Sequence, residues 1–79
     1  MRWKYKLIEK SDRIYIYAYS RETDDLDGVI SYDLETKQAQ LIKPCKGDER
    51  SNITKEMALE HFWKVINEGF PEYRYVCCG

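Results

Sequence analysis

The sequence predicts an α+β fold, in which a four-stranded antiparallel β-meander carries one amphipathic helix on one face and ends in a C-terminal strand, in the order ββββαβ. Two observations predict it. Over residues 2–43, apolar and polar side chains alternate with the period of a strand. Over residues 54–69, apolar side chains recur with the period of a helix. A chain of 79 residues has room for a single compact domain, residues 1–79.

The first two strands form a hairpin. Residues 2–9 alternate between basic side chains and the apolar side chains of Trp3, Tyr5 and Leu7. The polar residues 10–12 make the turn. In residues 13–21, two kinds of side chain alternate strictly. One set is aliphatic: Ile14, Ile16 and Ala18. The other set is aromatic: Tyr15, Tyr17 and Tyr19. The two sets point to opposite faces of the sheet.

A second hairpin completes the meander. Residues 22–28 form an acidic loop, in which Gly28 is expected to supply a positive φ. Strands are expected over residues 29–33 and over Gln38–Lys43, with a turn between them where the Asp33 side chain bonds the backbone. Pro44 ends the fourth strand, because it has no N–H to donate to a neighbouring strand. A loop follows to residue 52.

One helix follows the loop, with Thr54 as its expected N-cap. Its apolar side collects the following residues: Ala58, Leu59, Phe62, Trp63, Val65 and Ile66. Gly69 and Pro71 end the helix, since glycine accepts the left-handed conformation and proline cannot continue the helix; Phe70 is expected to fold back onto Val65. Residues 72–77 then alternate again as a fifth strand.

The core follows from placing the helix on the aliphatic side of the second strand. The expected core residues are Trp3, Tyr5, Leu7, Ile14, Ile16, Ala18, Ile30, Leu41, Leu59, Phe62, Trp63 and Ile66. This choice leaves Tyr15, Tyr17 and Tyr19 on the uncovered sheet face beside Lys4 and Lys6. It also predicts that Ile16→Ala destabilises the fold more than Tyr17→Ala.

The row of tyrosines is the predicted binding surface, with Tyr15, Tyr17, Tyr19, Lys4 and Lys6 as its residues. Tyrosine is enriched at protein interfaces, so the favoured function is that of a small non-enzymatic protein that binds a second copy of itself, as a homodimer, or another protein. The alternative is a single-stranded nucleic-acid binding module that stacks bases on tyrosines and pairs phosphates with lysines. A third interpretation is that the tyrosines only stabilise a two-sided sheet.

Charge and cysteine content limit the other classes. The 13 basic and 14 acidic residues nearly cancel, which disfavours nucleic acid as a partner. No cofactor motif is present, and no membrane segment is expected. Three cysteines and no secretory signal predict a reducing cytoplasm. A thiol or metal site at Cys45, His61 and Cys77 is a weaker alternative, because the cysteines, including Cys78, lack the spacing of zinc ligands.

Overall fold

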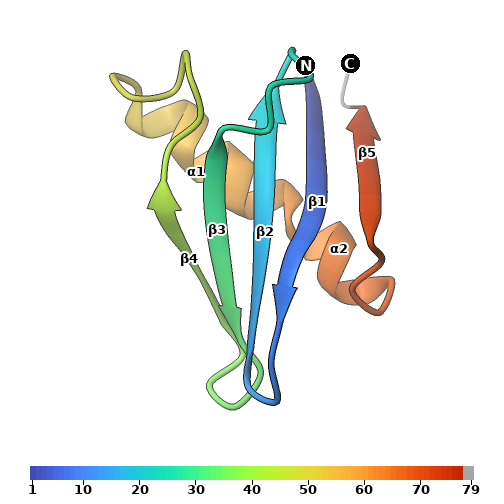
Figure 1. Ribbon diagram of the computed structural model, residues 1–79. Coiled ribbons are helices and arrows are strands. Elements are labelled where there is room, and N and C mark those ends of the chain that lie inside the picture. Colours follow the sequence, from blue (N-terminus) through green and yellow to red (C-terminus); the bar gives the residue numbers. More distant parts are fainter. Residues whose placement is uncertain (78–79) are drawn as a thin grey trace.

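A computed structural model describes residues 1–77 and confirms the α+β fold (Figure 1). Five antiparallel strands form one sheet in the order β4-β3-β2-β1-β5. The strands are β1 Arg2–Lys10, β2 Ile14–Arg21, β3 Gly28–Asp33, β4 Gln38–Lys43 and β5 Tyr73–Cys77. The helices are α1 Asn52–His61 and α2 Trp63–Asn67. The last strand, β5, returns to the sheet beside the first, β1.

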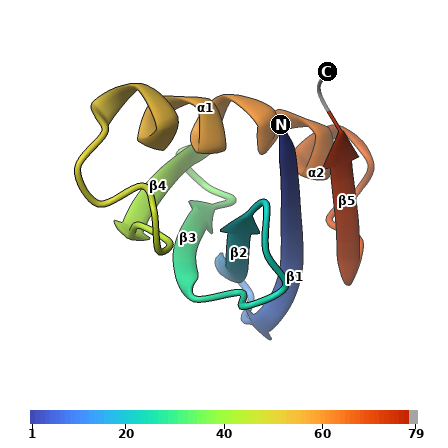
Figure 2. The ribbon, with the colours of Figure 1, turned by 90° about the horizontal axis from the view of Figure 1, so that it is seen from above.

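Both helices lie on the same face of the sheet (Figure 2). The opposite face, toward the viewer in Figure 1, carries no second layer within residues 1–77. We call these the covered face and the uncovered face. No helix in residues 1–77 is both long enough and apolar enough to cross a membrane.

The predicted orientation of β2 is wrong. Tyr17 and Tyr19 are fully buried, and Tyr15 packs against the same core. Ile14 and Ile16 instead lie on the uncovered face, where they are half-buried. Ala18 is buried as expected, at 6% exposure, but it too lies on the uncovered face, outside the main core. The helices therefore cover the aromatic side of β2.

A single extra residue in β1 accounts for the reversal. Near the turn, Glu9 pairs with Ile16, but beyond it Leu7 pairs with Tyr17, which leaves Ile8 as a bulge. Without this bulge, Leu7 would stand opposite Ala18, and the aliphatic side of β2 would share a face with Leu7. One added residue shifts the register by one and moves every side chain of the partner strand to the other face.

Tyrosines fill this core because their hydroxyls reach backbone groups at its boundary. The Tyr5 hydroxyl donates to the carbonyl of Ala58 at 2.7 Å, and the Tyr17 hydroxyl donates to that of Pro71 at 2.6 Å. The Tyr19 hydroxyl oxygen accepts the N–H of Cys45 at 3.0 Å. A buried hydroxyl without a partner would be costly, so these three bonds make the buried rings acceptable.

The helical segment is bent at Phe62. The N–H of Phe62 donates to the carbonyl of Leu59, so the carbonyl of Ala58 is available to Tyr5. The Phe62 ring sits at the centre of the core, with its centroid 5.3 Å from that of Tyr17. The bend turns Trp63 outward to 49% exposure, so the prediction that Trp63 is a core residue is wrong.

The ends of the helical segment differ in how well they were predicted. The N-cap is Ser51 rather than Thr54: the Ser51 side chain accepts the N–H of Thr54 at 3.2 Å. The C-terminal end is as expected, with Gly69 at φ +80° and the N–H of Phe70 bonded to the carbonyl of Val65 at 3.0 Å.

The other core predictions are mostly confirmed. Trp3, Tyr5, Ile30 and Phe62 are fully buried. Four further predicted residues pack at the margin of the core: Leu7, Leu41, Leu59 and Ile66. Several fully buried residues were not predicted: Cys45, Ala58, Val65 and Val76.

Gly28 has a different role from the one expected. Its φ is not in the left-handed region; Glu22 and Leu26 hold the positive φ angles of this loop, at 66° and 50°. A Cβ atom on Gly28 would lie 2.2 Å from Cε1 of Tyr19, because the Tyr19 ring lies across the glycine. Gly28 is therefore required for space and not for backbone conformation.

Candidate functional site

The structure separates the predicted binding residues. Lys4 and Lys6 lie on the uncovered face, as expected. Along β1 they alternate with Trp3 and Tyr5, whose side chains are buried on the covered face. Tyr15, Tyr17 and Tyr19 lie on the covered face, so they do not share a surface with the two lysines. A surface that combines these tyrosines with these lysines does not exist in the fold.

Two other tyrosines take their place. Tyr73 and Tyr75 on β5 stand directly opposite Lys6 and Lys4 of β1, and their side chains are 50% and 39% exposed. The Nζ atom of Lys4 lies 6.0 Å from the centroid of the Tyr75 ring. The sequence marked β5 as a strand but gave no register for it, so these tyrosines could not be assigned to a face.

Acidic residues partly neutralise the cations next to these tyrosines. Lys4 forms an ion pair with Asp24 of the acidic loop. Arg2 pairs with Glu22 at 3.5 Å, and the Tyr75 side chain, followed by Glu22, raises the pKa of Arg2. Lys6 is exposed. At this end of the uncovered face, the basic side chains are therefore partly neutralised by carboxylates of the acidic loop.

The centre of the uncovered face is apolar. Both sheet irregularities place an isoleucine there: Ile8 is the extra residue of β1, and Ile42 is the extra residue of β4. Their side chains are 55% and 56% exposed. Ile16 and Val29 lie between them on β2 and β3. Exposed aliphatic side chains on two different strands, with further apolar side chains between them, make a continuous apolar surface and not scattered single residues.

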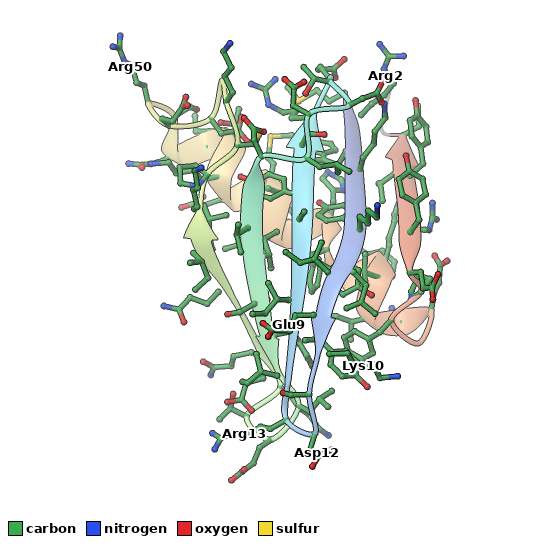
Figure 3. The ribbon with its side chains drawn as sticks, in the orientation of Figure 1. Arg2, Glu9, Lys10, Asp12, Arg13 and Arg50 are labelled. Atoms are coloured by element: carbon green, nitrogen blue, oxygen red, sulfur yellow. The ribbon has the colours of Figure 1, made fainter. Side chains whose placement is uncertain are left out.

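A depression of about 390 Å³ opens at the hairpin end of the same face. Its lining includes Ile14, Ser31, Asp33, Thr36, Gln38 and Gln40. Asp33 also accepts bonds from Arg13 and from the N–H groups of the turn, which holds its pKa below the usual value, with Arg13 as the main cause. Figure 3 looks onto this face, with Arg13 at the hairpin end and Arg2 at the opposite end.

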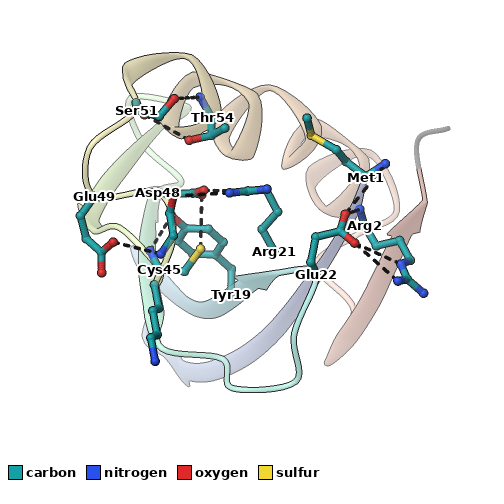
Figure 4. A network of polar contacts seen from close by, with 12 residues as sticks. Met1, Arg2, Tyr19, Arg21, Glu22, Cys45, Asp48, Glu49, Ser51 and Thr54 are labelled. Atoms are coloured by element: carbon teal, nitrogen blue, oxygen red, sulfur yellow. Dashed lines mark hydrogen bonds and ion pairs between the residues drawn. The ribbon is translucent and has the colours of Figure 1, made fainter.

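A buried polar network lies at the other end of the sheet, beside the loop before α1 (Figure 4). Nε of Arg21 lies 2.6 Å from the fully buried carboxylate of Asp48. The thiol of Cys45 donates to the same carboxylate at 3.3 Å. Burial, together with Asp48, raises the pKa of Cys45 to about 11, so the thiol is protonated near neutral pH and is a poor nucleophile. The network holds the loop against the sheet.

The three residues of the predicted thiol or metal site do not form one constellation. Cys45 belongs to the buried network, whereas His61 on α1 stacks on Trp3 with ring centroids 4.4 Å apart. Cys77 pairs with Arg2, which puts it on the uncovered face, away from the helices. No group of three or more potential metal ligands occurs within residues 1–77. Cys78 lies outside the described residues.

Comparison of the chain with protein-family models, with curated proteins and with solved structures found no match. Exposed apolar side chains, two exposed tyrosines and a depression occur together on the uncovered face, which makes this face the candidate site.

Proposed function

We propose that the protein acts through a protein–protein interface on the uncovered face, and that its partner is a second copy of itself. The observation that carries the proposal is the apolar centre of this face, with Ile8 and Ile42 more than half exposed on either side of Ile16 and Val29. A face of this kind gains stability when a partner removes it from water.

Three features favour a second copy as the partner. A chain of 79 residues has a thin core, and dimerisation is a common way for small domains to bury more apolar area. The exposed tyrosines suit an interface, because their rings are apolar and their hydroxyls remain compatible with water in the monomer. Each end of the face also carries charged groups that can pair between copies: Lys6 is exposed beside the ion pairs of Arg2 and Lys4, and at the other end Asp33 and Glu35 share Arg13. The surface can therefore complement itself when two copies are related by a two-fold axis.

The test compares three isoleucine-to-aspartate variants. Ile8→Asp and Ile42→Asp place a charge in the apolar centre, and Ile53→Asp places the same charge at the start of α1, where Ile53 is 72% exposed. We expect the wild type and Ile53→Asp to sediment as dimers in analytical ultracentrifugation, and the other two variants to sediment as monomers. A monomeric wild type at the highest soluble concentration, or three variants with equal behaviour, contradicts the proposal.

A second candidate function is single-stranded nucleic-acid binding. Tyr73 and Tyr75 now supply the stacking surface, with Lys4 and Lys6 opposite them across the strand pair. Aromatic rings on a sheet beside cations are how such modules hold bases and phosphates. The ion pairs of Lys4 and Arg2 with the acidic loop weaken this alternative, because phosphates would compete with carboxylates already in place.

Titration of a fluorescent oligonucleotide at two salt concentrations tests this second candidate. Binding that weakens with added salt and that is lost in Tyr75→Ala and Lys6→Ala supports it, because phosphate contacts release counterions. Binding that is absent, or that does not change with salt, rules it out.

We infer a cytoplasmic location from the cysteines. Cys45 and Cys77 are both free thiols, and Cys45 is bonded to Asp48 in the core, a state that suits a reducing compartment. Fractionation of cells expressing the native chain, with an antibody against it, checks this location; recovery in an oxidising compartment contradicts it.

A further inference from the structure

The uncovered face has two dissimilar corners. At one corner, Tyr73 and Tyr75 project from the edge strand β5, and Tyr75 is level with Ser20 near the end of β2. At the other corner, the depression lies near the opposite edge strand β4, where Gln38 is level with Ile14 at the start of β2. The tyrosines and the depression are therefore diagonally opposite each other.

The chemistry of the depression suits a phenol side chain. Ile14 offers an apolar contact for a ring, and the polar groups of Ser31, Thr36, Gln38 and Gln40 offer partners to a hydroxyl group. This mixture of apolar and hydrogen-bonding surface matches a tyrosine better than it matches an aliphatic side chain or an ion.

Each corner carries charged side chains that can pair between copies. Next to the tyrosines, Arg2 pairs with Glu22, Lys4 pairs with Asp24, and Lys6 is exposed on the same face. Next to the depression, Asp33 and Glu35 share the guanidinium of Arg13, and Lys37 lies in the same turn. Lys6 of one copy can therefore approach the carboxylates that share Arg13 in the other copy, and such pairs fix the orientation of the partners.

A two-fold axis along the other diagonal of the face places the tyrosine corner of each copy on the depression corner of the other copy. The same contact therefore forms twice in one dimer. Such an axis runs in the plane between the two sheets, from the side of Ile42 to the side of Ile8, and it places each isoleucine close to its counterpart. It also crosses the strands of the two sheets at a steep angle, and near-orthogonal packing is one of the two usual arrangements of stacked sheets.

We infer that each copy in the dimer inserts Tyr73 and Tyr75 into the depression of the other copy, with the two sheets crossed. This inference rests on the proposed homodimer and specifies which side chains of each copy complete the site of the other. The depression is then a receptor for a defined segment of the second copy, β5.

The experiment uses two variants that damage opposite halves of the contact. The first, Tyr73→Ala with Tyr75→Ala, removes the inserted side chains. The second, Ser31→Trp, fills the depression, and Gln40→Trp repeats this at an exposed position of the same lining. Circular dichroism and urea unfolding establish that each variant is folded. We expect each variant alone to dimerise about tenfold or more weakly than the wild type, because buried tyrosines are frequent interface hot spots.

The decisive measurement is a mixture of the two variants. A heterodimer of the tyrosine-deficient copy with the filled copy retains one intact contact, whereas either homodimer retains none. We therefore expect sedimentation to show dimers in the mixture at concentrations where each variant alone is monomeric. If the variants dimerise as well as the wild type, or if the mixture stays monomeric, the crossed arrangement is wrong. The proposed homodimer then still stands if Ile42→Asp separates the wild-type dimer, and it fails only if the wild type itself is monomeric.

Discussion

On β2, the tyrosines are more deeply buried than the isoleucines, which is the reverse of what the hydrophobicity of these side chains predicts. On the covered face, Tyr17 and Tyr19 are fully buried, and their hydroxyls bond to backbone groups at the edge of the core. On the uncovered face, Ile14 and Ile16 are only half-buried. The difference teaches that a long ring with a satisfied hydroxyl can be a better core residue than a shorter aliphatic side chain.

The largest expected contrast is between neighbouring residues of β2. Tyr17→Ala should lower the free energy of unfolding by about 3–5 kcal/mol, as removal of a buried aromatic side chain does. Ile16→Ala should lower it by about 1–2 kcal/mol in a dilute monomer, because the side chain is half-buried on the uncovered face. Urea unfolding of both variants measures the two values. Equal losses, or a larger loss for Ile16→Ala, would show that the faces are assigned wrongly.

A second pair of neighbours tests the same contrast on β3. Gly28→Ala places a methyl group against the Tyr19 ring and should cost about 3 kcal/mol, at the upper end for overpacking. Val29→Ala, on the uncovered face, should cost about 1 kcal/mol.

Tyr19→Leu removes the ring and serves as the background for a control. In that background, Gly28→Ala should lower the free energy of unfolding much less than in the wild type, because the ring atom that the added methyl group would contact is absent. An unchanged cost would point to the backbone of residue 28, and not to the ring, as the reason for glycine.

How much of this could be read from the sequence depends on the element. The hairpins, the helix and its end at Gly69 depend on local signals, namely alternation, helical periodicity and a glycine followed by proline, and these were predicted correctly. The face of β2 depends on the bulge at Ile8, one residue in a neighbouring strand that no local pattern distinguishes. The exposure of Tyr73 and Tyr75 likewise depends on a neighbouring strand, because the pairing of β5 with β1 determines which face these side chains occupy.

The predicted binding site shows the same division. Lys4 and Lys6 were placed correctly because the alternative would have buried basic side chains. Tyr15, Tyr17 and Tyr19 were misplaced because tyrosine is compatible with either face. A usable signal was Gly28, since a glycine in a strand often marks the close approach of a neighbouring side chain.

Removal of single hydroxyl groups should have a smaller effect. Tyr5→Phe leaves the Ala58 carbonyl without the partner that it needs at the bend of the helix, and should cost about 1–2 kcal/mol. Tyr75→Phe removes a hydroxyl from the uncovered face and should change the free energy of unfolding by less than about 0.5 kcal/mol. Thermal or urea unfolding of both variants at one low protein concentration, which keeps the chain monomeric, provides the comparison.

Ionisation of the buried Tyr17 and Cys45 side chains should not affect stability at neutral pH, and should lower it only at alkaline pH. Burial raises the pKa of Tyr17 to about 12 and that of Cys45 to about 11, from values of 10.0 and 9.0 in an unperturbed chain. A raised pKa of an acidic group means that the fold favours the neutral form. The stability that these groups support is therefore fully present below pH 9 and is lost as the pH rises through 11 and 12.

Tyr17→Phe separates this effect from other alkaline changes. The variant keeps the ring but cannot ionise at this position, so its urea midpoint should fall less steeply than that of the wild type between pH 10 and pH 12. Tyr75→Phe, on the uncovered face, should follow the wild type over the same range. If Tyr17→Phe loses stability as steeply as the wild type, ionisation of Tyr17 does not contribute to alkaline unfolding, and the burial of the Tyr17 hydroxyl beside Pro71 must be weaker than the structure indicates.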